Sequence, residues 1–160
     1  STATPTTSSP PSSPAPPNGR TTRHGRERTG ILTRFIGHDR AVEKQLDLDE
    51  AHAEIQARVP LWQSAGLTVA AITWRDQGRG WPPPITSNRD EVIEADSVGV
   101  AITKGSQEGR VVVFDGGWAD FDYLDWEMQD NVVSETPGWG APLSASEFGE
   151  VLDRLAALFR

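Results

Sequence analysis

In the segment Ser97-Val-Gly-Val-Ala-Ile-Thr-Lys-Gly-Ser-Gln-Glu-Gly-Arg-Val-Val-Val-Phe114, two strand-like runs flank a short loop bounded by glycines. Such a loop between two β-rich runs is typical of a β-hairpin. Val98, Val100 and Ile102 alternate with other residues, which predicts a half-buried first strand. In the second run, residues 110–114, the stretch Val111–Phe114 is apolar on both faces, as in a central strand covered on both sides. The segment therefore predicts the middle of an antiparallel sheet.

The next segment, Asp115-Gly-Gly-Trp-Ala-Asp-Phe-Asp-Tyr-Leu-Asp-Trp-Glu127, interleaves acids with large aromatic residues. Its two glycines predict a turn after the hairpin. If Asp120 to Tyr123 form a strand, Asp120 and Asp122 share one face and Phe121 and Tyr123 share the other. The alternation predicts a strand with an aromatic core side and an acidic outer side.

The flanking sequence adds helices and further strands. Asp47 or Asp49 is a candidate N-cap for a helix over Glu50–Arg58, which Pro60 is expected to end or kink. Ser144 and Glu147 fit a capping box, and apolar residues recur behind them at helical spacing. The remaining expected elements are a first strand at 30–36, a buried strand at 67–74, a loop at 75–84 and a short strand at 132–133.

Together these elements predict an α+β domain. The expected order is β-α-β-β-β-β-α, with an antiparallel sheet of about five strands and an N-terminal and a C-terminal helix packed on it. Ser, Thr and Pro make up fifteen of residues 1–18. We therefore expect residues 1–29 to be a disordered linker with a basic arm, and residues 30–160 to be one compact acidic domain.

Charge is distributed unevenly along the chain. Residues 20–40 hold six Arg against two acids, whereas residues 41–160 hold nine basic against twenty-one acidic residues, a net charge of −12. An acidic domain is repelled by nucleic-acid phosphates and by anionic membranes, so we expect neither as its partner. No apolar run has the length of about 20 residues that a membrane span requires. The charge favours a basic partner.

Enzymatic motifs are missing from the sequence. It has no cysteine, no Gly-x-Ser-x-Gly elbow, no phosphate-binding glycine loop and no histidine pair with zinc spacing. Asp120 and Asp122 on one strand would lie roughly 7 Å apart, near the separation of the carboxylate pair in inverting glycosidases. This is weak evidence for a glycosidase, because any Asp-x-Asp strand has the same spacing. The acids from Asp115 to Asp125 include oxygen ligands suited to Ca²⁺ or Mg²⁺, but they do not match an EF-hand loop. We assign no catalytic residue, no cofactor and no metal ligand, and lean towards a protein that is not an enzyme.

Six tryptophans are many for a chain of 160 residues. Exposed tryptophans are typical anchors of binding surfaces. Their ordinary alternative role is to close the ends of a small sheet. The predicted partner-binding residues are the acids and tryptophans of the segment 115–127 with two loop tryptophans: Trp118, Asp120, Asp122, Asp125, Trp126, Trp81 and Trp139.

At the level of architecture alone, a small acidic α+β domain without catalytic motifs is similar to the immunity proteins that neutralise bacterial polymorphic toxins. The resemblance rests on no motif, so no residue takes a role from it. It implies a non-catalytic module that neutralises or docks a basic protein, such as a toxin. The alternatives are a secreted module that binds carbohydrates or small ligands, with Trp81, Trp118 and Trp139 as stacking platforms, and a metal-dependent hydrolase that uses the acids from Asp115 to Asp125.

Compartment and source are inferred from composition. Arg is preferred over Lys, and Ala, Gly and Pro are abundant. This composition indicates a GC-rich genome, and we expect a bacterial source. The sequence favours a cytoplasmic location, while the Pro/Ser/Thr-rich linker leaves secretion open.

Overall fold

The computed structural model describes residues 44–128 and 131–160. These residues form two helices and one antiparallel sheet, which confirms the α+β class. The sheet has seven strands rather than about five, and the expected strand at 30–36 lies outside the described residues. The elements are α1 (Leu48–Ser64), β1 (Thr68–Val69), β2 (Thr73–Asp76), β3 (Ile85–Thr86), β4 (Ala95–Lys104), β5 (Gln107–Phe114), β6 (Ala119–Asp125), β7 (Val132–Glu135) and α2 (Ala145–Ala157).

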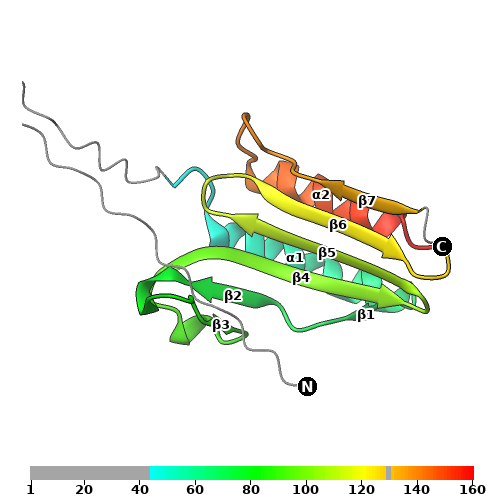
Figure 1. Ribbon diagram of the computed structural model, residues 1–160, viewed down its shortest axis with the longest axis horizontal. Helices are drawn as coiled ribbons and strands as arrows, with labels where there is room; N and C mark the ends of the chain where they lie inside the picture. The colour runs from blue at the N-terminus through cyan, green and yellow to red at the C-terminus, as the bar shows by residue number, and fades with distance from the viewer. Residues whose placement is uncertain (1–43, 129–130) are drawn as a thin grey trace, which may run out of the picture. The chain divides into compact units, whose positions relative to one another are not determined.

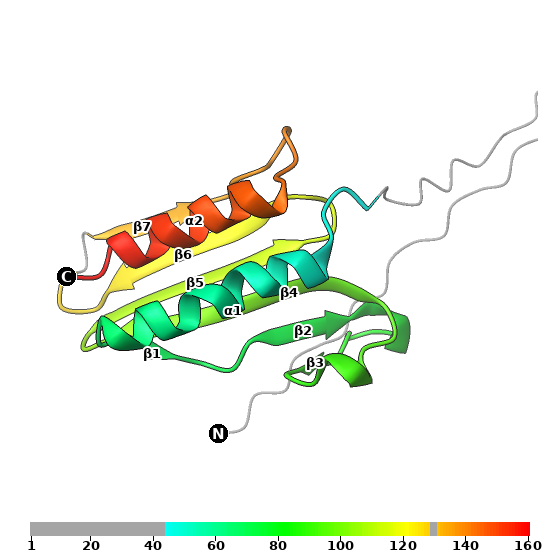
Figure 2. The same ribbon diagram turned by 180° about the vertical axis from the view of Figure 1, so that it is seen from behind.

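Both helices cover the same face of the sheet. The strands run in the spatial order β3-β2-β4-β5-β6-β7, and β1 also pairs with β4. Figure 2 shows α1 and α2 lying side by side in front of the strands, and Figure 1 shows the opposite face with no helix over it. We call this second side of the sheet the open face. Within the part of the chain that the structure describes, no helix or strand covers it.

The core lies between the sheet and the two helices. The β4–β5 hairpin pairs Val98 with Val113 and Val100 with Val111, and all four side chains are buried on the helix side. In β6, Phe121 and Tyr123 are each 1% exposed on that same side. Helix side chains that are fully buried against these strands include Ile55, Phe148, Leu152 and Leu155. Removal of this apolar area from water stabilises the fold. Because each strand buries one side, its apolar residues recur at every second position, and this alternation could be recognised in the sequence.

The capping box that begins α2 is confirmed. The Ser144 hydroxyl accepts from the backbone N–H of Glu147, and the Glu147 carboxylate accepts from the backbone N–H of Ser144. The Ser144 backbone N–H and the Ser144 hydroxyl, which also donates to the Glu147 carboxylate at 2.7 Å, hold the pKa of Glu147 below its ordinary value. At the other end of the helix, the ring of Phe159 packs edge-on against Tyr123, with centroids 5.3 Å apart. The capping box fixes the first residue of α2, and the Phe159 ring connects the end of the chain to Tyr123 of β6.

Two expectations about helix and strand ends are wrong. Asp47 is the N-cap of α1 as expected, but the helix does not end at Pro60 and continues to Ser64, while the expected kink at Pro60 stays a prediction. The last turn is held because Trp62 is buried in the core and the Ser64 hydroxyl donates to the carbonyl of Pro60. The expected strand over 67–74 is divided into β1 and β2 with a shift of register against β4.

The central strand is covered on one side only. Val112 and Phe114 of β5 are half-buried on the open face, so the expected cover on both sides is wrong for this strand. On the open face, the Phe114 ring is instead partly covered by Trp118 and by the Arg75 guanidinium. Neither α1 nor α2, the two described helices, is long and apolar enough to cross a bilayer.

Candidate functional site

Strand β6 divides its side chains between the two faces of the sheet as its periodicity predicts. Phe121 and Tyr123 point towards the helices, whereas Asp120 and Asp122 lie on the open face. Asp122 accepts hydrogen bonds from Arg110 and from Ser134, each 2.9 Å long. Asp120 forms no ion pair or side-chain hydrogen bond with any described residue. Asp120 therefore presents a partly exposed carboxylate that an incoming cation can use.

A row of aromatic side chains lies beside these acids. Phe114 and Trp118 stack with their rings 4.0 Å apart and nearly parallel, at 12°. Trp139 meets Trp118 edge-on, with centroids 5.4 Å apart. We call Phe114, Trp118 and Trp139 the aromatic row. Trp139, at the outer end of the row, is 73% exposed.

Arg75 of β2 extends the aromatic row across the sheet. Its guanidinium lies 5.3 Å from the centre of the Phe114 ring, a distance at which cation–π attraction operates. Two of its nitrogens donate to the Asp96 carboxylate, at 2.8 and 2.6 Å. Hydrogen bonds to Asp96, with smaller effects from Asp115 and Asp120, raise the pKa of Arg75 above its ordinary value. Arg75 is thus held as a cation at one end of the row.

Two glycines bring the loop of Trp139 against Trp118. Gly117 turns the chain after β5 at φ 79°, and its carbonyl accepts from the backbone N–H of Leu143 at 2.7 Å. Gly138 has φ 85° and lies so close to the Gly117 carbonyl that a Cβ atom would collide with it. Only glycine suits both the backbone angle and the space. The turn at 116–117 and the loop at 136–143 are therefore packed together.

Trp81 lies near the same end of the open face. It is 91% exposed and borders a pocket of about 370 Å³ together with Arg75 and Asp96. Trp81 therefore borders Arg75 on one side, while Trp118 stacks on Phe114 and Trp139 lies beyond Trp118. Neither Arg75 nor Phe114 was predicted from the sequence, because each is unremarkable in its own strand and matters only through the register of β2, β4 and β5.

Trp126 lies at the opposite end of β6 from Trp118. It is 62% exposed and borders a second pocket of about 310 Å³, with Leu124 and Val132. Asp122 and Arg110 also line this pocket. The predicted surface is thus divided into an aromatic row at one end of the sheet and an apolar pocket at the other.

Asp125 is set apart from the exposed acids. It is 6% exposed and accepts hydrogen bonds from the Ser106 hydroxyl and from the backbone N–H of Glu127. These bonds, the Ser106 bond first, lower its pKa below the ordinary value. Its contacts connect the β4–β5 turn to the end of β6, so we leave Asp125 out of the surface proposed below.

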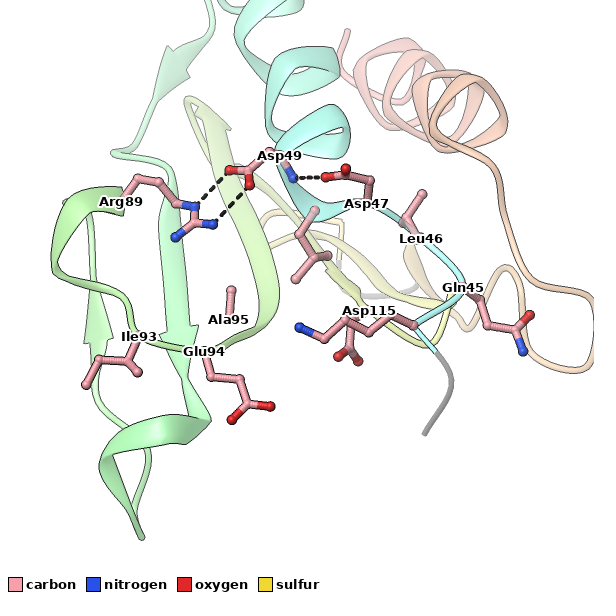
Figure 3. Close-up of a pocket in the computed structure, with 11 residues that line it drawn as sticks. Gln45, Leu46, Asp47, Asp49, Arg89, Ile93, Glu94, Ala95 and Asp115 are labelled. Atoms are coloured by element: carbon pink, nitrogen blue, oxygen red, sulfur yellow. Dashed lines mark hydrogen bonds and ion pairs between the residues drawn. The ribbon is translucent and has the colours of Figure 1, made fainter. Parts of the chain in front are cut away.

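Asp115 lines a pocket at the N-terminus of α1. The pocket has a volume of about 470 Å³ and holds the Arg89–Asp49 ion pair, whose shortest contact is 2.8 Å. Glu94 and Asp115 lie below this pair in Figure 3. Burial, and to a smaller extent the nearby Asp96 and Glu94 carboxylates, raises the pKa of Asp115, although Lys44 opposes the shift.

The acids of the segment 115–127 do not converge on one point. Asp115 lines the α1 pocket, Asp120 and Asp122 lie on the open face, and Asp125 is buried at the end of β6. Across residues 44–128 and 131–160, no three His, Asp or Glu side chains are close enough to hold a metal ion. The described residues therefore provide no support for a metal-dependent hydrolase.

Comparison with known proteins gave no relative. No protein-family model, no curated protein and no solved structure matches this chain. A functional proposal therefore depends on the geometry and charge of the described residues.

Proposed function

We propose that this domain is a non-catalytic binding module that docks a basic protein on its open face. The observation that carries the proposal is the aromatic row, which lies beside the Asp120 carboxylate on a sheet face that no described helix covers. Aromatic anchors bordered by charge are the usual centres of protein interfaces, because each ring buries a large area with few rotatable bonds.

Charge supports a basic partner. Residues 41–160 carry a net charge of −12 from nine basic and twenty-one acidic residues. Six of the described Arg side chains already form ion pairs within the domain: Arg58, Arg75, Arg79, Arg89, Arg110 and Arg154. The surplus acids attract a cationic protein from a distance and speed its association at low salt.

The domain itself illustrates how a partner's arginine would be held. Arg75 lies over Phe114, Arg89 over Trp74 and Arg154 over Phe121, at distances of 4.7 to 5.3 Å from the ring centres. Each of these arginines also pairs with a carboxylate. Arginines of the partner can lie in the same way over the exposed rings of Trp139 and Trp81, and Asp120 offers a carboxylate to a further cation.

An immunity protein that neutralises a basic toxin is the protein of this kind that we favour. Such a protein acts by covering its target and needs no catalytic group. The acidic surface, the α+β architecture and the exposed tryptophans support this choice. A bacterial gene for a basic toxin next to the gene for this chain would favour this proposal.

The test is capture of proteins from the source cells with the whole chain as bait. Asp120→Asn removes the carboxylate that no described residue pairs, and Glu150→Gln removes the same charge from an exposed position on α2. We expect a basic protein whose affinity falls with added salt and with Asp120→Asn, but not with Glu150→Gln. Equal losses for the two variants, or capture that salt does not change, would contradict the proposal.

The pocket beside Trp81 favours a second candidate, a module that binds a carbohydrate or another small ligand. An exposed indole next to the polar Arg75–Asp96 pair can stack on a sugar ring while the polar groups meet its hydroxyls. Titration of the tryptophan fluorescence with a panel of glycans distinguishes the two candidates. If no glycan changes the fluorescence, this second candidate is rejected.

A further inference from the structure

Among the described strands, β7 is an edge strand with one unpaired side. The spatial order of the sheet ends at β7, and β6 is the one described strand that pairs with it. The other end of the sheet is β3, which has only two residues, Ile85 and Thr86. β7 has four residues, none of them proline or lysine, the two residues that commonly protect an exposed edge. Among the described strands, β7 is thus the longer of the two terminal edges.

The direction of each backbone group in β7 follows from two hydrogen bonds. The Asp125 N–H donates to the Asn131 carbonyl at 3.3 Å, and the Ala119 N–H donates to the Pro137 carbonyl at 2.8 Å. Backbone groups alternate along an antiparallel strand, so the odd-numbered residues between them face β6. The N–H and C=O groups of Val132 and Ser134 therefore point away from the sheet. No backbone hydrogen bond to another described residue uses them.

The apolar pocket of about 310 Å³ lies next to this free edge on the open face. Leu124, Trp126 and Val132 form its apolar wall. Trp126 is 62% exposed and Val132 is 58% exposed. A side chain that projects from a strand added beyond β7 would lie beside Val132 and reach this wall.

We propose that the basic partner docks by adding an extended segment to β7 as the next strand of the sheet. This inference rests on the function proposed above and states how the partner is bound. Backbone hydrogen bonds to Val132 and Ser134 supply the pairing, and the pocket receives a side chain of the added strand.

The surroundings of β7 determine the composition of the added segment. On the open face it lies beside Val132 and Ser134, so apolar side chains suit that face. On the helix side it lies beside Val133 and Glu135, and a basic side chain on that face can share the Glu135 carboxylate with Arg154, which donates to it at 2.7 Å. Alternating apolar and basic residues meet both requirements.

Charge also decides between a partner and a second copy of this chain. The acids around the edge are Glu108, Asp122, Glu127 and Glu135, opposed by Arg110 and Arg154. A second copy would bring the same excess of acids to the same place, and its net charge of −8 repels another copy. A basic segment is attracted instead.

The test uses the whole chain and a short peptide of alternating Val and Arg. Its control is the same peptide with every Arg in the D form, which keeps the charge but spoils a regular strand. In the protein, Ser134→Pro removes the outward N–H, and Ser134→Ala removes only the hydroxyl that donates to Asp122. Proline is tolerated on the free side of an edge strand.

We expect the L peptide to bind and to slow hydrogen exchange at the amides of Val132 and Ser134. Ser134→Pro should weaken binding about tenfold relative to Ser134→Ala, as expected for the loss of a backbone hydrogen bond. The proposal is overturned if the L peptide does not bind, if the control binds equally well or if the two variants bind alike. Association of the chain with itself through β7 would also overturn it.

Two further measurements keep the outcomes separate. If Ser134→Pro does not fold, the test is hydrogen exchange in the unaltered chain with the L peptide bound. Amides of Val132 and Ser134 that stay unprotected then overturn the proposal. If the captured basic partner loses affinity with Asp120→Asn but not with Ser134→Pro, docking along β7 is wrong and the proposed function stands. If neither variant affects the partner, both proposals fail.

Discussion

Replacement of Trp139 by alanine separates a structural role of the aromatic row from a binding role. Trp139 is 73% exposed, and its ring meets the Trp118 ring edge-on, with centroids 5.4 Å apart. Loss of one such aromatic contact costs about 1 kcal/mol of folding stability. The expected fall in melting temperature is about 4 °C for a domain of this size. Trp139→Ala should therefore remain folded.

The expected loss in partner affinity is larger. A tryptophan side chain presents roughly 200 Å², so the exposed share of Trp139, 73%, is about 150 Å². At about 25 cal/mol per Å², full coverage by a partner would contribute about 3.5 kcal/mol, and half coverage about 2 kcal/mol. A loss of about 2 kcal/mol raises the dissociation constant about 30-fold.

The assay pairs urea denaturation with titration calorimetry of the captured basic partner. Leu61→Ala is the matched control, because Leu61 is 67% exposed but lies on α1, in the helical layer. The reasoning is refuted if Trp139→Ala changes affinity by less than about 3-fold, a difference below 1 kcal/mol. It is also refuted if Leu61→Ala weakens binding as much as Trp139→Ala.

Three further substitutions test the fold around the site. Burial raises the pKa of Asp115, so its ionised form disfavours folding and stability falls as pH rises through that pKa. Asp115→Asn should raise the melting temperature near pH 7, with the gain vanishing near pH 3, and an equal gain at both values would contradict this cause. Gly138→Ala combines a positive φ with a collision at the Gly117 carbonyl, and urea denaturation should show a loss of about 2 kcal/mol or more. Gly109→Ala places a Cβ atom 2.8 Å from Leu155 of α2, so the urea midpoint should fall. A midpoint at or above that of the unaltered chain would contradict the close packing of α2 on β5.

Local sequence patterns were sufficient for the elements whose form depends on near neighbours. The β4–β5 hairpin follows from alternating valines around a glycine-bounded loop, and the start of α2 follows from the capping box of Ser144 and Glu147. The division of β6 into a buried aromatic side and an acidic side follows from a period of two. In each case the residues that determine the structure are close together in the chain.

Features that depend on tertiary contacts were not predicted. Nothing in the run Val111–Phe114 indicates that both helices lie on one face and leave Val112 and Phe114 on the other. The continuation of α1 through Pro60 depends on burial of Trp62, which is 4% exposed.

The aromatic row is a second feature of this kind. It joins Phe114 to Trp118 and Trp139 through the register of the strands and the packing of two glycine turns. The tryptophans could be selected as candidates from composition, but the stacking of Trp118 on Phe114 and the edge-on contact of Trp139 could not.

A footprint of the partner on the two faces of the domain tests the central claim most directly. Hydroxyl-radical labelling reports the exposure of Trp81, Trp118 and Trp139 on the open face and of Leu61 on the helical layer. With the captured basic partner bound, we predict protection of the three tryptophans and unchanged labelling of Leu61. Protection of Leu61 with unchanged labelling of the tryptophans would contradict docking on the open face.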